Sequence, residues 1–379
     1  MGRPVRVLHL FGRMNRGGAE TFIMRVYRHL DRGEVQFDFG VHSDLPGHYD
    51  DEIRDLGGRI FVLPRPSPLR LPAYVQALKG LLRREGPFGA VHSHVHFYSG
   101  VPLVAARLVG VPLRIAHSHN TDDGKGRALP RKTYRRWMRW LISRNATHML
   151  GCSRSACEAL YGPECWQDDR VRVLRYCVEL APFESLLQDR KTLRVRVGLP
   201  GEGRLVGHVG RFDVAKNHRF LVQIFEALSS RLPDARLILV GDGPLRPEVE
   251  RLVAEKGLEG KVLFLGVRAD VPQIMGCLDA FLFPSLWEGI PLALLEAQAA
   301  GVPCVISEVI SGEVDLGLGL LHSVALNAAS DVWAEHVLQV LGHSRPDWGA
   351  REGAFRRNRY DVQGAASLLR SIYVGDQGK

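Results

Sequence analysis

Short apolar runs alternate with longer amphipathic stretches along the whole chain. Runs such as 5–11, 37–41 and 90–93 have the length of buried strands, whereas 19–30 repeats its apolar positions with the period of a helix. Further strands are expected at 60–63, 113–116, 171–174, 205–209, 237–240, 262–265 and 281–283, and further helices at 74–85, 131–143, 333–341 and 362–373. Because strands that alternate with helices are typical of doubly wound parallel sheets, the pattern predicts an α/β protein.

The stretch 281–301 places two carboxylates around the start of a helix. Glu288 lies in a turn next to Gly289, and Glu296 lies about one and a half turns into the helix that follows Pro291. A helix N-terminus behind a glycine turn attracts anions, because its free N–H groups and its dipole both favour negative charge. For one isolated Glu, a helix cap or a solvated side chain would be the simpler interpretation. The spacing of two acids here favours a ligand site.

The rest of that helix is expected to pack on a sheet. One apolar stripe is formed by Leu292, Leu295, Ala299 and Val302, and Gly301 stands where a left-handed residue would end the helix.

A second glycine loop follows the expected strand 205–209. It reads G-R-F-D-V-A-K and places Arg211 and Lys216 five residues apart. Two cations in such a loop suit a diphosphate, because Arg can bind two oxygens at once and Lys acts as a point charge. The chain contains no Asp-x-Asp pair, which would hold a divalent metal on the phosphates. Cationic side chains are therefore expected to take that part.

Residues 283–303, F-P-S-x-x-E-G-x-P-x-x-L-L-E-A-x-A-x-G-x-P, resemble the signature of retaining nucleotide-sugar glycosyltransferases of family 4. Residues 307–316 resemble the bacterial exopolysaccharide-biosynthesis branch of that family, and the resemblance extends over nearly the whole chain. It implies a GT-B fold, in which two Rossmann-like doubly wound domains face a cleft. The expected domains are an acceptor-side domain 1–182, completed by the C-terminal helix 362–379, and a nucleotide-sugar-binding domain 183–361.

The resemblance also implies an activity and a set of residues. A sugar would move from a nucleoside diphosphate donor, with UDP expected, to a polysaccharide-precursor or lipid-linked acceptor with retained configuration. Glu296 would hold the ribose and Glu288 the sugar. Catalytic roles fall on His119, Arg211, Lys216 and Glu288. Donor-binding roles fall on Gly17, Gly18, Arg211, Lys216, Val267, Gly289, Ile290, Pro291, Leu292 and Glu296. Neither a metal nor a cofactor beyond the nucleotide-sugar substrate is implied.

Histidines collect where two expected strands end: His92, His94 and His96 after one, and His117 and His119 after the other. The carboxyl edge of a parallel sheet is where such folds bind ligands. The family places a histidine beside the transferred sugar here; His119 is the match and His117 the alternative, because the register is ambiguous by two residues. A zinc site is the rival interpretation. We expect none, since alternate strand residues point to opposite faces and no Cys or carboxylate joins the histidines at ligand spacing.

The net charge of +9 is distributed unevenly. Residues 1–182 carry 28 basic and 17 acidic side chains, or +11, whereas the remainder carries −2. Much of the excess lies in 125–144, which contains Lys125, Arg127, Arg131, Lys132, Arg135, Arg136, Arg139 and Arg144. A helix over 131–143 would pack Tyr134, Trp137, Met138, Leu141 and Ile142 on one face. It is either an ordinary surface helix or a basic element that rests on anionic lipid. No nucleic-acid-binding motif accompanies it.

Other features bound the protein's class. Six cysteines without C-x-x-C spacing are expected to be buried or reduced thiols. No run approaches the roughly 18 apolar residues of a membrane span, and the first residues do not form a secretory signal. A cytoplasmic protein is therefore expected, with a peripheral position on the inner face of the membrane as an option.

Two rivals to glycosyl transfer stay open. A GT-B epimerase or phosphorylase would share the fold, although no lysine stands in a context suited to pyridoxal phosphate. A non-catalytic sugar-nucleotide-binding protein is opposed by the intact set Arg211, Lys216, Glu288 and Glu296. The turn 176–179 reads Tyr-Cys-Val-Glu where the family has Asn-Gly-Val-Asp, which leaves the role of that turn open.

Overall fold

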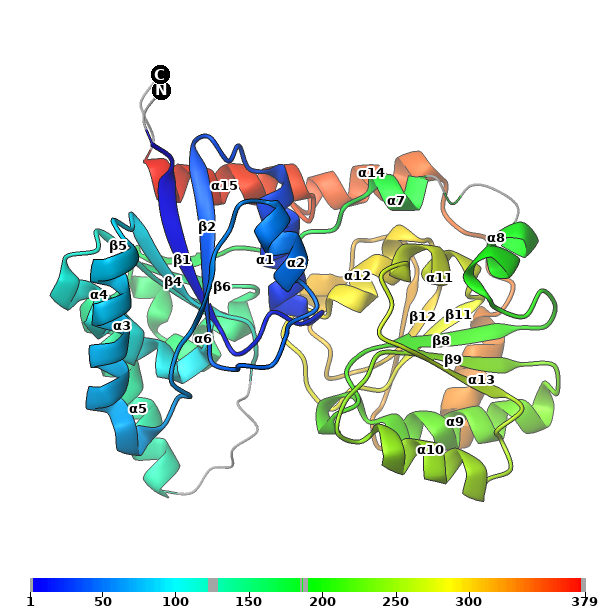
Figure 1. Cartoon of the computed structure of the whole chain (residues 1–379). Coiled ribbons are helices and arrows are strands. Elements are labelled where there is room, and N and C mark those ends of the chain that lie inside the picture. Colours follow the sequence, from blue (N-terminus) through cyan, green and yellow to red (C-terminus); the bar gives the residue numbers. More distant parts are fainter. Residues whose placement is uncertain (1–2, 122–128, 185, 187–189, 376–379) are drawn as a thin grey trace. The chain divides into compact units, whose positions relative to one another are not determined.

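The computed structural model describes residues 3–121, 129–184, 186 and 190–375. The chain divides into two compact units (Figure 1): unit 1 consists of Met1–Cys177 and Val362–Lys379, and unit 2 of Val178–Asp361. The first unit thus ends at Cys177 rather than at residue 182, and the C-terminal helix belongs to it. Each unit contains its own parallel sheet with helices, which confirms the α/β class.

Unit 1 has a seven-stranded parallel sheet in the order β3-β2-β1-β4-β5-β6-β7. The strands are β1 (Val5–Phe11), β2 (Val35–Val41), β3 (Ile60–Val62), β4 (Ala90–Ser93), β5 (Leu113–Ser118), β6 (His148–Gly151) and β7 (Val171–Val173). The helices are α1 (Gly18–His29), α2 (Asp50–Asp55), α3 (Leu71–Glu85), α4 (Gly100–Val109), α5 (Leu129–Asn145), α6 (Arg154–Tyr161) and α15 (Val362–Val374). Short 3-10 turns are η1 (Pro68–Arg70), η2 (His96–Ser99) and η3 (Cys165–Gln167).

Unit 2 has a six-stranded parallel sheet in the order β10-β9-β8-β11-β12-β13. The strands are β8 (Leu205–Val209), β9 (Arg236–Val240), β10 (Val262–Gly266), β11 (Ala280–Phe283), β12 (Cys304–Ser307) and β13 (Leu321–Val324). The helices are α7 (Ala181–Glu184), α8 (Arg190–Val197), α9 (His218–Arg231), α10 (Arg246–Glu255), α11 (Val271–Cys277), α12 (Leu292–Ala299), α13 (Ser330–Val340) and α14 (Trp348–Arg357). The 3-10 turns are η5 (Val214–Lys216) and η6 (Gly312–Val314).

The C-terminal helix α15 is part of the core of unit 1. It packs on α1, β1 and β2, and it buries Leu369, Ile372 and Tyr373. Arg370 pairs with Glu34 beyond the end of α1, which fixes the helix at its exposed side.

The strand order reverses once in each sheet. In unit 1 the reversal lies between β1 and β4, and in unit 2 it lies between β8 and β11. A doubly wound sheet opens a crevice at the carboxyl ends of these two strands, because the helices that follow them leave on opposite faces. The loops after β1, β4, β8 and β11 are therefore where the topology places a ligand.

Two expectations about the whole chain can be compared with the structure. All six cysteines are free and buried, as predicted. Within the described ranges, no helix has both the length and the apolar character needed to cross a membrane.

Candidate active site

The strand reversal of unit 2 brings the two predicted motifs together. Lys216, at the end of the loop after β8, donates to Glu288, in the loop after β11, with 2.5 Å between Nζ and Oε1. Both side chains are largely buried, at 17% and 13% exposure. Lys216 also lies over the ring of Phe283, the last residue of β11, 4.9 Å from its centroid. The loops are thus joined by a partly desolvated ion pair, whose strength exceeds that of a surface pair.

Backbone contacts hold the same two loops side by side. The amide of Leu286 donates to the carbonyl of Ala215 at 2.7 Å. Asn217, in a left-handed conformation with φ of 55°, donates through Nδ2 to the carbonyl of Pro284 at 3.2 Å. Asp213 caps η5 by accepting from the amide of Lys216. The ion pair is therefore set on a rigid backbone frame, as a binding site requires.

A glycine allows a third loop to approach this frame. Gly241, after β9, has φ of 131°, and a Cβ placed there would lie 2.0 Å from the carbonyl oxygen of Gly210. Only a residue without a side chain fits both the backbone angle and the contact. The loops after β8 and β9 therefore meet at the carboxyl edge of the sheet.

Helix α12 differs from its expected packing. It begins at Leu292, with Pro291 as the extended residue before it, and ends before Gly301, whose left-handed φ of 71° was predicted. The stripe of Leu292, Leu295, Ala299 and Val302 is buried, but so are Leu294, Glu296, Ala297 and Gln298. The predicted stripe is confirmed as buried, and other sides of the helix are buried as well, because α11 and α14 pack on α12 in addition to β12.

The remaining donor-binding candidates of unit 2 lie around the same edge. Gly289, Ile290, Pro291 and Leu292 are buried in the turn that leads into α12. Glu296 is 7% exposed inside that helix. Arg211 is exposed, and its guanidinium takes part in none of the hydrogen bonds or ion pairs found for the described residues. Val267 is 39% exposed in the turn after β10. Charged and apolar surfaces thus meet around the start of α12.

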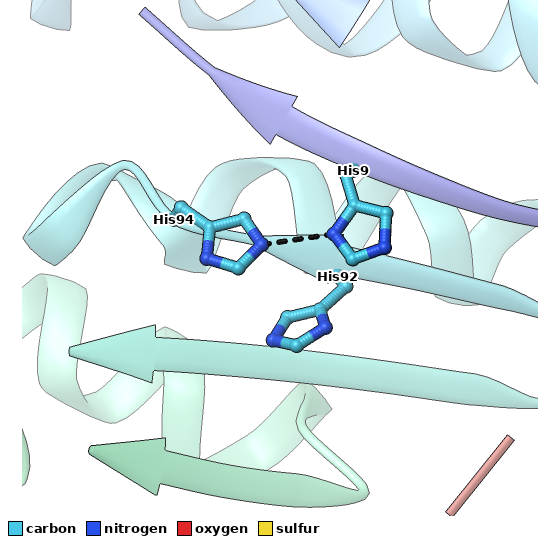
Figure 2. Close-up of side chains that lie close together, drawn as sticks. All are labelled: His9, His92 and His94. Carbon is cyan, nitrogen blue, oxygen red and sulfur yellow. Dashed lines mark hydrogen bonds between the residues drawn. The ribbon is translucent and has the colours of Figure 1, made fainter. Parts of the chain in front are cut away.

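The strand reversal of unit 1 carries five histidines. His9 of β1 lies opposite His92 of β4 in the strand register, and His94 follows two residues later. His117 and His119 continue the layer on and after β5. Figure 2 shows His9, His92 and His94, with the hydrogen bond that joins His9 to His94 at 3.0 Å. Sequence reasoning expected alternate residues to face apart, but residues two positions apart share a face of a strand, so the histidines gather.

These histidines form two hydrogen-bonded chains. In the first, His9 Nδ1 meets His94 Nε2 at 3.0 Å, His94 Nδ1 meets His119 Nε2 at 2.8 Å, and His119 Nδ1 meets the hydroxyl of Tyr176 at 2.9 Å.

In the second chain, the hydroxyl of Tyr373 meets His92 Nδ1 at 2.6 Å, and His92 Nε2 meets His117 Nδ1 at 3.2 Å. Two buried nitrogens, His9 Nε2 and His117 Nε2, are left without a partner.

Burial keeps this layer uncharged. Desolvation lowers the pKa of His9 to about 3, and it lowers the pKa of His92, His94, His117 and His119 well below the usual value, with neighbouring histidines adding to the shift. The five rings are therefore neutral imidazoles at physiological pH. Each carries one N–H and one lone pair.

The histidine predicted for the sugar site has no idle ring nitrogen. His119 is 9% exposed, and both of its nitrogens are bonded to protein groups. His117, the alternative, is fully buried and keeps Nε2 without a partner. Tyr176, which holds His119, also packs its ring near Gly18, 3.6 Å from where a Cβ would stand. Gly17 caps α1 just before it. The glycine loop and His119 are thus connected through Tyr176.

Sequence reasoning missed three members of this layer. His9 lies within an apolar strand and shows no motif, but the register of β1 with β4 places it beside His92. Tyr176 occupies the turn that departs from the family pattern, and its bond to His119 gives that turn a structural role. Tyr373 lies about 280 residues from its partner His92, so only the return of α15 reveals the contact.

Helix α5 packs a narrower face against unit 1 than the sequence predicted. Trp137 and Trp140 are 45% and 52% exposed, so Trp137 is not on the packed face, which consists of Met138 and Ile142 with Tyr134 and Leu141 beside them. Trp137 lies on the solvent side because η2, α4 and α6 cover only the opposite side of the helix.

An exposed stripe is left, which we call the α5 surface: Lys132, Arg136, Trp137, Trp140 and Arg144. Arg139 belongs elsewhere, because it donates to the carbonyls of Ala159 and Leu160. Lys125 and Arg127 lie outside the described residues.

Two family profiles match the chain. Residues 17–177 match the glycosyl transferase 4-like domain, and residues 203–343 match glycosyl transferases group 1. EpsF of Bacillus subtilis, whose name gives it a provisional assignment as a glycosyltransferase, is 38% identical over 97% of this chain and 96% of its own. A galactosyltransferase of Escherichia coli, named for UDP-Gal and α-D-GlcNAc-diphosphoundecaprenol, is 27% identical over 81% of this chain and 82% of its own.

A solved structure has the same fold. The Anabaena protein HepE, determined in complex with UDP, aligns with a TM-score of 0.73 and 20% identity over 97% of this chain and 98% of its own.

Proposed function

This chain belongs to the family 4 glycosyltransferases with the GT-B fold, and from that membership we propose that it transfers a sugar from a UDP-sugar donor, with retained configuration, to a lipid-linked acceptor. The observation that carries the proposal is the Lys216–Glu288 ion pair at the strand reversal of unit 2. It joins the loop with two cations to the turn before α12. Donor diphosphate and donor sugar can therefore be bound by adjacent side chains.

The diphosphate is the group that this edge suits best. Arg211 is exposed with no other partner found among the described residues, and Lys216 can exchange its bond to Glu288 for a phosphate oxygen. The N-terminus of α12 adds free amides behind them. Charge that grows on the departing diphosphate is stabilised by such preorganised groups, usually the largest catalytic contribution. We propose that these cations act without a divalent metal on the phosphates, since the chain has no Asp-x-Asp pair.

We assign binding of the nucleoside and of the sugar to the two acids and the residues near them. Glu296 holds the ribose hydroxyls, Val267 borders the base, and Glu288 holds the sugar. His119 of unit 1 remains the proposed sugar-site histidine on the ground of the family resemblance, and both of its ring nitrogens are bonded, to Tyr176 and His94. Similarity supports UDP as the nucleotide: HepE was solved with UDP and with UDP-glucose, and the E. coli relative is named for UDP-Gal.

The α5 surface supports an acceptor at an anionic membrane. Its three cations and two exposed Trp residues form one stripe, which suits headgroups and the interface just below them. The E. coli relative is named for a diphosphoundecaprenol-linked acceptor, which is a lipid. Together these observations favour a peripheral position of unit 1 on the cytoplasmic leaflet.

The proposal is tested by product analysis. Purified protein is incubated with UDP-glucose, UDP-galactose or UDP-N-acetylglucosamine and a polyprenyl-diphosphate sugar, and the lipid product is analysed by mass spectrometry while UDP release is followed. One donor should give a product heavier by one sugar, and nuclear magnetic resonance should show the donor's anomeric configuration. UDP binding without product from any donor would favour the non-catalytic alternative, and conversion of the free nucleotide sugar would favour an epimerase.

A further inference from the structure

We propose that His94, His117 and His119 of unit 1 form a binding site for one transition-metal ion of the zinc type. One ring nitrogen from each residue lies within 4.8 Å of the other two. The three residues come from the ends of β4 and β5, which are neighbours in the sheet. A rigid sheet therefore supplies all three ligands.

The hydrogen-bond pattern indicates which nitrogen each residue would offer. His117 already has a buried Nε2 without a partner. His119 would bind through Nε2 and His94 through Nδ1, which now meet each other at 2.8 Å. Two ligands about 2.0–2.1 Å from a zinc ion lie about 3 Å apart. The ion would thus replace one existing hydrogen bond and use one nitrogen that has none.

Each of these ligands is also held from behind. Metal-binding histidines normally bond their second nitrogen to an outer group, which fixes the ring and its tautomer. His119 keeps its bond from Nδ1 to Tyr176, His117 keeps Nδ1 on His92, and His94 keeps Nε2 on His9. His92 is held in turn by Tyr373. All three outer contacts are therefore present before any ion binds.

The chemistry of the ligands selects the class of ion. Neutral imidazoles suit zinc, cobalt, nickel and copper, whereas magnesium, calcium and manganese prefer oxygen ligands. The described residues add no carboxylate or thiolate to this group of three. His94 is partly exposed, which leaves an approach for the ion and a position for a water molecule. The site therefore resembles three-histidine zinc sites with one open position.

A second group, His9, His92 and His94, also lies within 4.8 Å, but its hydrogen bonds oppose it. Both nitrogens of His92 are bonded, to Tyr373 and to His117, and Figure 2 shows His9 and His94 directed at each other. Even if His9 offered its unpartnered Nε2, an ion in this group would break one bond of His92 and one bond of His94, because both nitrogens of each are bonded. The observations thus favour the group that contains His117.

Metal content of the full-length protein tests the site without any activity assay. The chain is stripped with a chelator, reloaded with zinc alone, desalted, and analysed for metal by mass spectrometry. Wild type should retain about one zinc per chain. His94→Ala and His117→Ala should each weaken zinc binding by more than about 100-fold, the upper range for losing an outer partner alone. The control His42→Ala, at a buried histidine outside the cluster, should bind as wild type does.

Further variants separate the two groups of histidines. His119→Ala should abolish zinc binding, whereas His9→Ala should keep one zinc with affinity lower by about 10–100-fold, as for other outer partners. The reverse order would place the ion in the other group and contradict the proposal. Circular dichroism checks that each variant is folded.

The visible absorption spectrum of the cobalt-loaded wild type tests the site even if the variants do not fold. A nitrogen-ligated site should give visible ligand-field bands without the charge-transfer band of a thiolate. Wild type that retains no zinc and shows no cobalt bands would overturn the site, as would a thiolate spectrum.

Discussion

The strand reversals of the two sheets have the same topology and opposite chemistry. In unit 2 the edge between β8 and β11 is charged and partly exposed, with Arg211, Lys216 and Glu288 around the start of α12. In unit 1 the edge between β1 and β4 carries five neutral histidines, of which four are buried and His94 is partly exposed. The fold therefore decides where a ligand can bind, and the side chains decide what it is.

The comparison also explains the charge of unit 1. Its excess of basic residues does not lie at the strand reversal. Some of it is structural, as where Arg6 and Arg59 pair with the buried Asp38 and help to hold the pKa of that carboxyl below its usual value, against the desolvation that would raise it. Three further basic residues lie on the α5 surface: Lys132, Arg136 and Arg144. We therefore propose that the cations of unit 2 serve a diphosphate, whereas those of the α5 surface serve an extended anionic surface.

Removal of the charges of unit 2 should have the largest effect. Arg211→Ala and Lys216→Ala should each cost about 2–4 kcal/mol of transition-state stabilisation, measured as the loss of kcat/KM for donor. The free energy of unfolding should change little for Arg211→Ala, because Arg211 is exposed. Lys216→Ala should also lower stability, because it removes the ion pair of the largely buried Glu288. The matched control is Arg219→Ala. Arg219 is an exposed residue at the start of α9, and it pairs with Glu248 of α10. Turnover at the wild-type rate in both variants would remove the charged edge from the mechanism.

Reversal of the α5 surface tests the role given to unit 1. Lys132, Arg136 and Arg144 changed together to Glu should lose at least about 3 kcal/mol of binding to anionic vesicles, at roughly 1 kcal/mol per basic residue near the surface. Wild-type binding should fall with added salt. Sedimentation measures both, and UDP release without acceptor should be unchanged. Arg139 is left intact because it holds α6.

The charge-matched control for that triple variant lies in unit 2. Arg196, Arg251 and Arg357 are exposed there, and their change to Glu alters net charge by the same amount. Equal loss of vesicle binding in both triple variants would mean that total charge, and not the α5 surface, determines attachment.

Substitution of the two acids of unit 2 should affect the binding of free UDP and of the UDP-sugar differently. Glu296→Ala should weaken both free UDP and the UDP-sugar by about 1.5–3 kcal/mol, the range for hydrogen bonds to a charged group. Glu288→Ala should weaken only the UDP-sugar, because the sugar is the part of the donor that we assign to Glu288. Calorimetry with the two ligands gives the four affinities. Equal effects on free UDP would refute the division between ribose and sugar.

Low pH should reduce the stability of each unit through one buried, neutral histidine, His42 in unit 1 and His218 in unit 2. Burial, and for His218 the charge of Lys216, lowers the pKa of His218 to about 3; burial lowers the pKa of His42 to about 4. Both values lie below the unfolded pKa near 6.5, so the unfolded chain binds more protons and the stability present at neutral pH is lost as pH falls. Each group should contribute about 2 kcal/mol of loss between pH 7 and pH 5.

Urea unfolding at the two pH values measures that loss. His218→Phe and His42→Phe should each flatten the pH dependence by about that amount, whereas substitution of the exposed His48 should not. An unchanged slope in both Phe variants would show that these two rings are not kept neutral by the fold.

The sequence predicted elements best where their apolar pattern was long. β1 and β8 have the predicted bounds, and the α/β class is confirmed. β6, β12 and β13, each of four residues, were missed, although β4 of the same length was predicted with its bounds. The family signature indicated Lys216 and Glu288 as separate site residues, whereas their ion pair and the histidine layer were found only in the structure. The side on which Trp137 lies was decided by η2, α4 and α6, which no local pattern encodes.

The central claim is that side-chain cations of unit 2, and no metal on the phosphates, stabilise the departing diphosphate. The most direct measurement is UDP release from the UDP-sugar in excess EDTA, with wild type and Arg211→Ala side by side. The account predicts that wild type keeps its rate without magnesium or manganese, and that Arg211→Ala is slower by about 30- to 1,000-fold, the equivalent of 2–4 kcal/mol. Loss of wild-type activity in EDTA, restored by magnesium or manganese, would contradict it.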